Sequence, residues 1–223
     1  MKTAEEHFIL AEKHKMEGHL SEAVKEYKEM LTIYPESIPA LMNLANINYM
    51  LGYIKKAVKS YKKVLELKPN FSYALYRLGV AYYRSAQFRK AIKIFKKIIN
   101  MDSELYMAYN WLGLSYYHIG KEKRSIKAYA RLLKKAPEPT IVNYHQAIAL
   151  KAEGNYDKAI IRLEQLIKKH PNHVSAHYHL GLAYLGKHKP FVALEIFKKV
   201  VELDPKHKGA TEKIAYITEA PPL

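Results

Sequence analysis

The chain has 223 residues, of which 49% are hydrophobic and 26% charged, a composition typical of globular proteins and unlike that of disordered ones. The absence of cysteine excludes disulfides, thiolate metal sites and cysteine nucleophiles. Lysine and arginine number 37 against 21 acidic residues, and the resulting formal net charge of +16 favours acidic partners or anionic surfaces.

The N-terminal segment predicts no export signal. Its apolar stretch runs only from Phe8 to Ala11 before charged residues return, which is shorter than the apolar region of a signal peptide. Elsewhere no run of about 18 uncharged apolar residues occurs, so we expect no membrane-spanning helix. These features together predict a soluble, cytoplasmic protein.

The first predicted helix follows Thr3, because Thr3 and Glu6 have the spacing of a capping box. A pattern of small residues then recurs every 34 residues without an insertion. Its alanine or serine positions are Ala23, Ala57, Ala91, Ser125, Ala159 and Ala193. Earlier in each repeat a second small residue marks a place where two helices can cross closely: Ala11, Ala45, Gly79, Gly113, Ala147 and Gly181.

Each repeat reads as a helix, a turn and a second helix. In the second half, an aromatic or leucine follows the alanine by four residues and an aliphatic residue follows it by seven, which places all three on one helix face. The first half has the same spacing, as in Leu75, Gly79 and Tyr82. Gly18, Gly52, Gly120 and Gly154 mark the turns between the halves, and a proline or serine closes each repeat: Pro35, Pro69, Ser103, Pro137, Pro171 and Pro205.

The predicted elements are therefore six helix–turn–helix repeats and one further helix, which keeps the register through Ile214 and Ala215 and would cap the last repeat. The predicted repeats span 4–37, 38–71, 72–105, 106–139, 140–173 and 174–207, followed by the capping helix at 208–219 and a short tail at 220–223.

This succession of a large residue, Leu-Gly, Tyr, Ala, an aromatic, an aliphatic and Pro resembles the tetratricopeptide repeat family. The resemblance extends from Ala4 to His207. It implies an all-α fold, a right-handed superhelical solenoid forming a single domain over residues 1–223. It also implies that first helices line a concave groove, that second helices form much of the convex side, and that the chain is a non-catalytic adaptor binding a peptide segment of a partner protein.

Carried over from the family, the groove positions of this chain are mainly aromatic and mildly basic. Such a groove suits a peptide with acidic groups or apolar anchors, because rings give a large contact area and arginine binds carboxylates bidentately. The alternative interpretation is that several of the tyrosines pack across adjacent repeats. The candidate groove residues are Asn43, Asn46, Tyr73, Tyr76, Arg77, Tyr83, Arg84, Asn110, Trp111, Tyr117, His118, Tyr144, His145, Tyr178 and His179.

Some members of the family clamp the carboxylate terminus of heat-shock chaperones, but this chain matches that clamp poorly. Of the positions concerned, Asn43 and Arg77 have the expected residue types, whereas Phe8, Glu12 and Tyr73 do not. We therefore do not expect a chaperone tail as ligand. Asparagines 43, 46 and 110 are interpreted either as partners for a peptide backbone or as ordinary polar surface.

The second helices carry a lysine ridge, which is the second candidate surface. It is interpreted either as a solvated face or as a docking surface for an anionic membrane, an acidic protein or nucleic acid. Nucleic acid is disfavoured because lysine prevails over arginine and the rings lie on another face. The alternative function is thus a structural scaffold that docks through this ridge or self-assembles as a homo-oligomer. The ridge residues are Lys55, Lys56, Lys59, Lys62, Lys63, Lys93, Lys96, Lys97, Lys127 and Arg131.

No motif indicates catalysis. The histidines at 173, 177 and 179 lack both an HExxH pattern and a third ligand in helical register. Ser115 lacks the second glycine of a nucleophile elbow, and no glycine-rich phosphate loop is present. We therefore expect no enzymatic activity, no metal and no cofactor.

Overall fold

The computed structural model describes residues 2–102, 105–135 and 140–219, and within them the chain is all-α, as predicted. The helices are α1 (Ala4–Met16), α2 (Leu20–Ile33), α3 (Ile38–Met50), α4 (Ile54–Leu67), α5 (Ser72–Arg84), α6 (Phe88–Met101), α7 (Tyr106–His118), α8 (Glu122–Lys135), α9 (Thr140–Ala152), α10 (Tyr156–Lys169), α11 (Val174–Gly186), α12 (Pro190–Leu203) and α13 (Lys208–Glu219). None of these helices is long and apolar enough to cross a membrane.

The helix boundaries follow the 34-residue period of the sequence. Successive first helices begin at residues 4, 38, 72, 106, 140 and 174, and successive second helices begin at 20, 54, 88, 122, 156 and 190. The helix predicted at 208–219 is α13. The closing residues Ser103 and Pro137 and the predicted tail at 220–223 lie outside the described residues.

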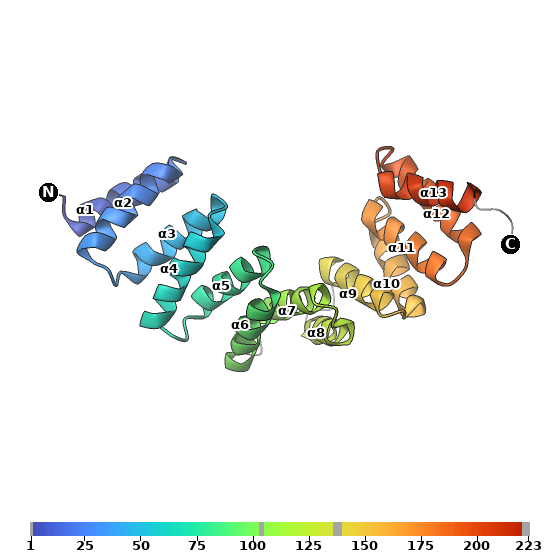
Figure 1. The fold of residues 1–223 in the computed structure, drawn as a ribbon, viewed down its shortest axis with the longest axis horizontal. Coiled ribbons are helices and arrows are strands. Elements are labelled where there is room, and N and C mark those ends of the chain that lie inside the picture. Colours follow the sequence, from blue (N-terminus) through green and yellow to red (C-terminus); the bar gives the residue numbers. More distant parts are fainter. Residues whose placement is uncertain (1, 103–104, 136–139, 220–223) are drawn as a thin grey trace. The chain divides into compact units, whose positions relative to one another are not determined.

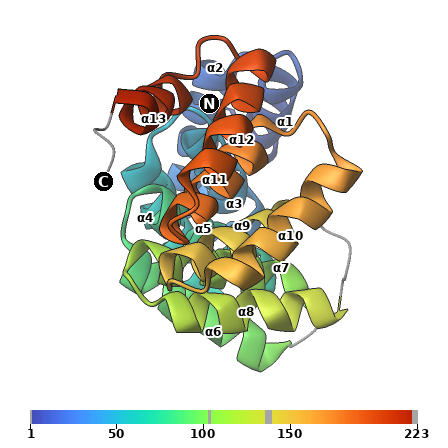
Figure 2. The same cartoon turned by 90° about the vertical axis from the view of Figure 1, so that its right-hand side faces the viewer.

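The helices divide between two compact units, unit 1 (Met1–Ser115) and unit 2 (Tyr116–Leu223). In unit 1, α1 packs on α2, α3 on α4 and α5 on α6, and each pair also contacts the next (Figure 1). In unit 2, consecutive helices from α8 to α13 pack in the same manner (Figure 2). The single domain and the right-handed superhelix stay predictions.

The repeating small and aromatic positions form the core between the helices. The alanines of the repeat, such as Ala57 and Ala91, have no exposed surface, and Ser125 takes the same fully buried place in the fourth repeat. The aromatic or leucine that follows by four residues is also buried, with an exposed fraction of 0% for Tyr61 and Phe95. Burial of these rings provides much of the hydrophobic stabilisation within each unit.

Glycine is required at positions 79 and 181, where a first helix crosses the phenylalanine ring of the second helix. A Cβ atom at Gly79 would lie 2.7 Å from Cζ of Phe95, and one at Gly181 would lie 2.6 Å from Cε1 of Phe197. Both rings are fully buried, so neither can move aside easily. The crossing point that the small residues predict is therefore a close contact between a helix backbone and a ring.

The turn between the two helices of a repeat uses the left-handed backbone conformation. Gly18, Gly52, Gly120 and Gly154 have φ between 66° and 87°. The same position in the third and sixth repeats holds Ala86 and His188, and both also have a φ of 56°. The turn geometry is thus the same in all six repeats, although two of them lack glycine.

We expect Ala86→Gly to stabilise the protein by about 0.5–1 kcal/mol, because the left-handed strain of alanine exceeds the extra backbone entropy that glycine loses on folding. Thermal unfolding followed by circular dichroism would measure the change. The control is the exposed helical residue Ala130, where the same substitution should cost about 1 kcal/mol. A lower midpoint for Ala86→Gly would contradict the argument.

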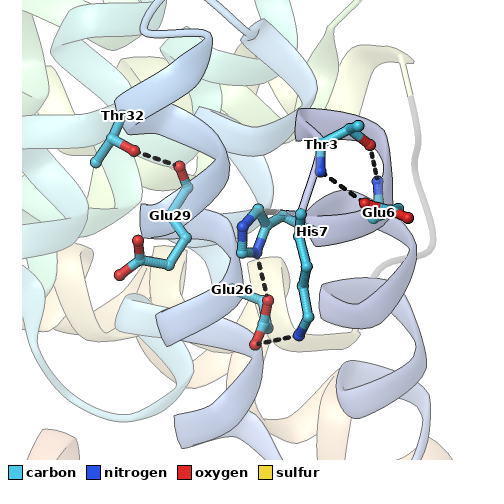
Figure 3. A network of polar contacts seen from close by, with 7 residues as sticks. Thr3, Glu6, His7, Glu26, Glu29 and Thr32 are labelled. Carbon is cyan, nitrogen blue, oxygen red and sulfur yellow. Dashed lines mark hydrogen bonds and ion pairs between the residues drawn. The ribbon is translucent and has the colours of Figure 1, made fainter.

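Polar contacts stabilise the start of α1 and join it to α2. The predicted capping box is present: Glu6 N donates to Thr3 Oγ1 at 3.2 Å, and Thr3 N donates to Glu6 Oε2 at 2.7 Å (Figure 3). Beside it, His7 Nδ1 lies 2.6 Å from Glu26 Oε2 (Figure 3). This contact with His7 lowers the pKa of Glu26, so the carboxylate stays ionised between α1 and α2.

Candidate functional site

Hydrogen bonds join the first helix of the third repeat to both helices of the second repeat. Tyr61 Oη donates to Asn46 Oδ1 at 2.7 Å, and Arg77 Nε donates to Asn46 Oδ1 at 3.1 Å and to Tyr61 Oη at 3.2 Å. These residues come from α3, α4 and α5. Two candidate groove residues, Asn46 and Arg77, therefore also connect the second repeat to the third.

The same three positions are linked one repeat earlier. Tyr27 Oη donates to Glu12, and Asn43 Nδ2 donates to Glu12 Oε1 at 2.7 Å. Burial and the hydrogen bond to Glu12 raise the pKa of Tyr27. Burial alone would raise the pKa of Glu12, but hydrogen bonds from Lys15 and Tyr27 bring it below its usual value. Asn43 is therefore hydrogen-bonded to Glu12, and Glu12 itself stands at one of the positions of the family's chaperone clamp.

Tyr49, Arg77 and Arg84 form a cationic group on α3 and α5, which we call the Tyr49 cluster; Arg84 is exposed, and Tyr49 and Arg77 are half-buried. The guanidinium carbons of Arg77 and Arg84 lie 4.6 Å and 4.8 Å from the centroid of the Tyr49 ring. Burial opposes the charge of Arg77, but the hydrogen bond to Tyr61 and the electrostatic influence of Tyr61, Tyr73 and Tyr49 together raise the pKa of Arg77. Within the described part of the chain, neither arginine forms an ion pair with a carboxylate.

Tyr49 was not among the candidate groove residues predicted from the sequence. A step of 34 residues back from Tyr83 would have found it, because both residues hold the same position in successive repeats.

Trp111 lies among rings of the preceding repeat. Its Nε1 donates to Tyr76 Oη at 2.8 Å, its ring stacks on Phe95 with centroids 6.4 Å apart, and Tyr83 meets it edge-on at 5.1 Å. Tyr76, Tyr83 and Trp111 are each half-buried. Their rings therefore contribute to packing between the third and fourth repeats.

Two other candidate groove residues of unit 1 differ in exposure. Tyr73 has half of its surface exposed. Asn110 is buried, and its Oδ1 has no hydrogen-bond partner among the described residues. Tyr73 is accessible to a ligand, whereas Asn110 is buried, and its assignment to the groove stays a prediction.

Unit 2 brings together an aromatic and basic group on α9 and α11. The ring of Tyr144 lies 5.7 Å from the rings of His145 and His179, and Tyr178 lies 4.6 Å from His207. Of the remaining candidates, Tyr117 is half-buried and His118 is exposed at the end of α7.

Burial controls the charge of this group in unit 2. It lowers the pKa of His145 and of Lys151, and, with the nearby charges of Lys151 and His207, lowers the pKa of His179 to about 4. His179 is therefore neutral at pH 7, which leaves an aromatic surface beside a partly buried lysine.

All ten ridge residues named from the sequence are exposed, on α4, α6 and α8. Lys97 Nζ donates a hydrogen bond to the carbonyl oxygen of Pro69 at 2.7 Å. In unit 1 the ridge surrounds a hollow of about 510 Å³ between α4, α5 and α6. Its lining is Lys62, Leu65, Glu66, Pro69, Leu75, Leu78, Tyr82, Lys90, Lys93, Ile94 and Lys97.

The residues considered for catalysis and metal binding have structural contacts. Ser115 is fully buried, and its Oγ donates to the carbonyl of Trp111 at 2.7 Å. His173 caps α11 by accepting a hydrogen bond from Ala176 N, and His177 Nε2 lies 2.7 Å from the carbonyl of Pro171. These contacts give each residue a role in its own helix or loop.

Several solved structures share the fold of this chain, whereas no curated protein matches it. The structure titled "Crystal structure of MamA protein" is 27% identical, with a TM-score of 0.70 over 85% of this chain and 99% of that one. YrrB, titled a TPR protein with an unusual peptide-binding site, is 22% identical, with a TM-score of 0.70 over 83% of this chain and 96% of its own. A tetratricopeptide repeat protein from Parabacteroides merdae is 20% identical, with a TM-score of 0.65 over 96% and 84% of the two chains.

The sequence also matches family models. The one described as "Tetratricopeptide repeat" matches residues 76–138 and 144–208, and the one described as "TPR repeat" matches residues 49–85. Together with the 34-residue spacing of the helices, these matches show that the chain belongs to the tetratricopeptide repeat family.

Proposed function

We propose that the chain is a non-catalytic adaptor that binds an acidic peptide segment of a partner protein on the first-helix face of unit 1. The observation that carries this proposal is the Tyr49 cluster. Arg77 and Arg84 stack on one tyrosine ring, and neither is neutralised by a carboxylate of the described residues. Two oriented guanidinium groups of this kind can receive carboxylates from a ligand.

The partner's chemistry follows from what surrounds the cluster. Arg77 is anchored through its Nε to Asn46 and Tyr61, so its position is fixed before a ligand arrives. The exposed ring of Tyr73 lies on the same helix and offers apolar contact area. A preorganised charge beside an accessible ring favours a peptide that combines acidic residues with an apolar side chain.

The family supports an interaction role of this kind. Tetratricopeptide repeat proteins generally mediate protein–protein interactions, and YrrB, which has the same fold, is titled as having a peptide-binding site. For this chain, the peptide class and the face that binds it are our proposal.

The test is the affinity of short peptides that each carry one apolar side chain among aspartate and glutamate residues, measured by calorimetry. Arg84→Ala should weaken the best of these peptides by about tenfold, which corresponds to about 1.4 kcal/mol. Arg84 is suited to this test because it is exposed and its described contact is with the Tyr49 ring. Its replacement should therefore change ligand binding without disturbing the fold.

The matched control is Arg89→Ala, because Arg89 is also exposed but belongs to α6. This control should retain the affinity of the unmodified chain. Equal peptide affinities for the Arg84 and Arg89 variants would contradict the proposal. So would an unmodified chain that binds a peptide with lysine in place of the acidic residues as tightly as it binds the acidic peptide.

The hollow between α4, α5 and α6 favours the second candidate function, docking of an acidic protein on the lysine ridge. Its floor includes Leu75, Leu78 and Ile94, and four lysines surround it against one glutamate. An acidic surface that inserts an apolar side chain would match both features. Docking in this hollow would be lost on replacing Lys62 and Lys93 with glutamate, whereas binding at the Tyr49 cluster would not.

A further inference from the structure

Two histidines and a glutamate converge at the turn between α1 and α2. His14 lies in the last turn of α1, Glu17 is its C-cap, and His19 is the N-cap of α2. Each contributes one potential ligand atom, and these three atoms lie within 4.8 Å of one another. The sequence interpretation missed this group because the spacing crosses a turn rather than following one helix face.

The backbone holds the two histidines close together. Gly18 adopts the left-handed conformation, with φ of 80°, and so reverses the chain between α1 and α2. His19 N then donates to the carbonyl oxygen of His14 at 2.8 Å. The imidazole rings come to lie 6.1 Å apart, with Glu17 between them in sequence.

The distances are close to those that a metal ion requires. Glu17 Oε2 lies 3.4 Å from His19 Nδ1 and 3.9 Å from His14 Nδ1. Ligands at about 2.0–2.2 Å from a tetrahedral zinc ion are separated by about 3.3 Å. Small side-chain rotations would therefore bring the three atoms into a common coordination sphere.

A second observation, the environment of one histidine nitrogen, also favours a ligand at this site. His14 Nδ1 is a buried atom without a hydrogen-bond partner among the described residues. Unpaired buried polar atoms are uncommon, because they have lost water without gaining another partner. Coordination of a cation by Nδ1 would provide that partner.

The electrostatic setting also accepts a cation. The carbonyl end of α1 carries the negative end of the helix dipole, which favours positive charge at this position. Glu17 Oε2 is the carboxylate oxygen near both imidazoles, whereas Lys13 Nζ lies 3.9 Å from the other oxygen, Oε1. Two imidazole nitrogens and one carboxylate oxygen form a donor set that suits Zn²⁺.

We propose that His14, Glu17 and His19 bind a divalent transition-metal ion, Zn²⁺ in particular, with water completing its coordination. The ion joins the end of α1 to the start of α2 and thereby fixes the turn of the first repeat. This site is independent of the peptide-binding proposal, because none of its residues belongs to the Tyr49 cluster or to the lysine ridge.

The test is calorimetric titration of the full chain with Zn²⁺, followed by a titration with Co²⁺ monitored by visible absorption. We expect one Zn²⁺ per chain at this site and the absorption bands of Co²⁺ bound by nitrogen and oxygen ligands. His19→Ala and Glu17→Gln should each weaken Zn²⁺ binding by roughly tenfold or more, since loss of even an outer-shell partner has an effect of that size. Both residues are exposed, so neither change removes core packing.

The matched control is His188→Ala. His188 is an exposed histidine with a positive φ in the corresponding turn of the sixth repeat. This variant should bind Zn²⁺ as the unmodified chain does. If the unmodified chain binds no Zn²⁺, or if His19→Ala and Glu17→Gln bind it as tightly as His188→Ala, the proposal is wrong. Far-UV circular dichroism of each variant separates loss of binding from loss of fold.

Discussion

Replacing Phe95 with alanine is expected to lower the free energy of unfolding of unit 1 by about 3–5 kcal/mol, the range for a fully buried phenylalanine. The ring has no exposed surface, stacks on Trp111 and lies against the backbone of Gly79. Its removal would leave a cavity between two repeats that the rigid helix crossing cannot close. Loss of stability, rather than loss of a ligand contact, is therefore the expected result.

Urea unfolding monitored by the fluorescence of Trp111, the only tryptophan of the chain, would measure this loss within unit 1. The control is Tyr34→Ala, because Tyr34 is in the same unit but has 63% of its surface exposed. That change should alter stability by less than about 0.5 kcal/mol. Similar losses for the two variants would show that the ring at position 95 is not part of the core.

Deleting residues 38–71 is expected to leave a folded, shorter protein, whereas deleting only residues 38–53 should abolish the helical fold of unit 1. The first deletion removes α3 and α4 together and joins α2 to α5, which then takes the place of α3. Repeat proteins tolerate such a change because their stability comes from individual repeats and from neighbouring interfaces. The second deletion would remove α3 alone and leave α4 next to α2 without the helix that normally packs between them.

The contacts at the new junction support this expectation. Ser37, which caps α3, would directly precede Ser72 at the start of α5. Arg77 would take the position of Asn43, beside Glu12 and Tyr27, where an arginine and a carboxylate can pair. Circular dichroism and the cooperativity of thermal unfolding would distinguish the two proteins. Equal loss of structure in both would contradict the description of the chain as a series of exchangeable repeats.

The sequence predicted the helices accurately because each framework residue has one role in every repeat. Ala57, Tyr61 and Gly79 are buried or in close contact wherever the 34-residue step places them. The left-handed conformation of Ala86 was not predictable from its residue type, since alanine rarely adopts it. It follows instead from the geometry that the other repeats impose on the turn.

The candidate site was harder to predict than the fold. The spacing of Asn46 and Arg77 placed them on first helices, but their shared hydrogen bonds with Tyr61 depend on the packing of neighbouring repeats. Asn110 holds an expected groove position and yet is buried, because exposure depends on how closely the surrounding helices pack. A helical position predicts the direction of a side chain better than its accessibility.

The hydrogen bonds of Arg77 restrict how this surface can evolve. A substitution at position 77 that suited another ligand would remove the donor shared by Asn46 and Tyr61 and leave these two side chains with only the hydrogen bond to each other. Arg84 and Tyr73 carry no such link and can vary with little effect on folding. New binding preferences should therefore arise first at Tyr73 and Arg84, while Asn46, Tyr61 and Arg77 change together or not at all.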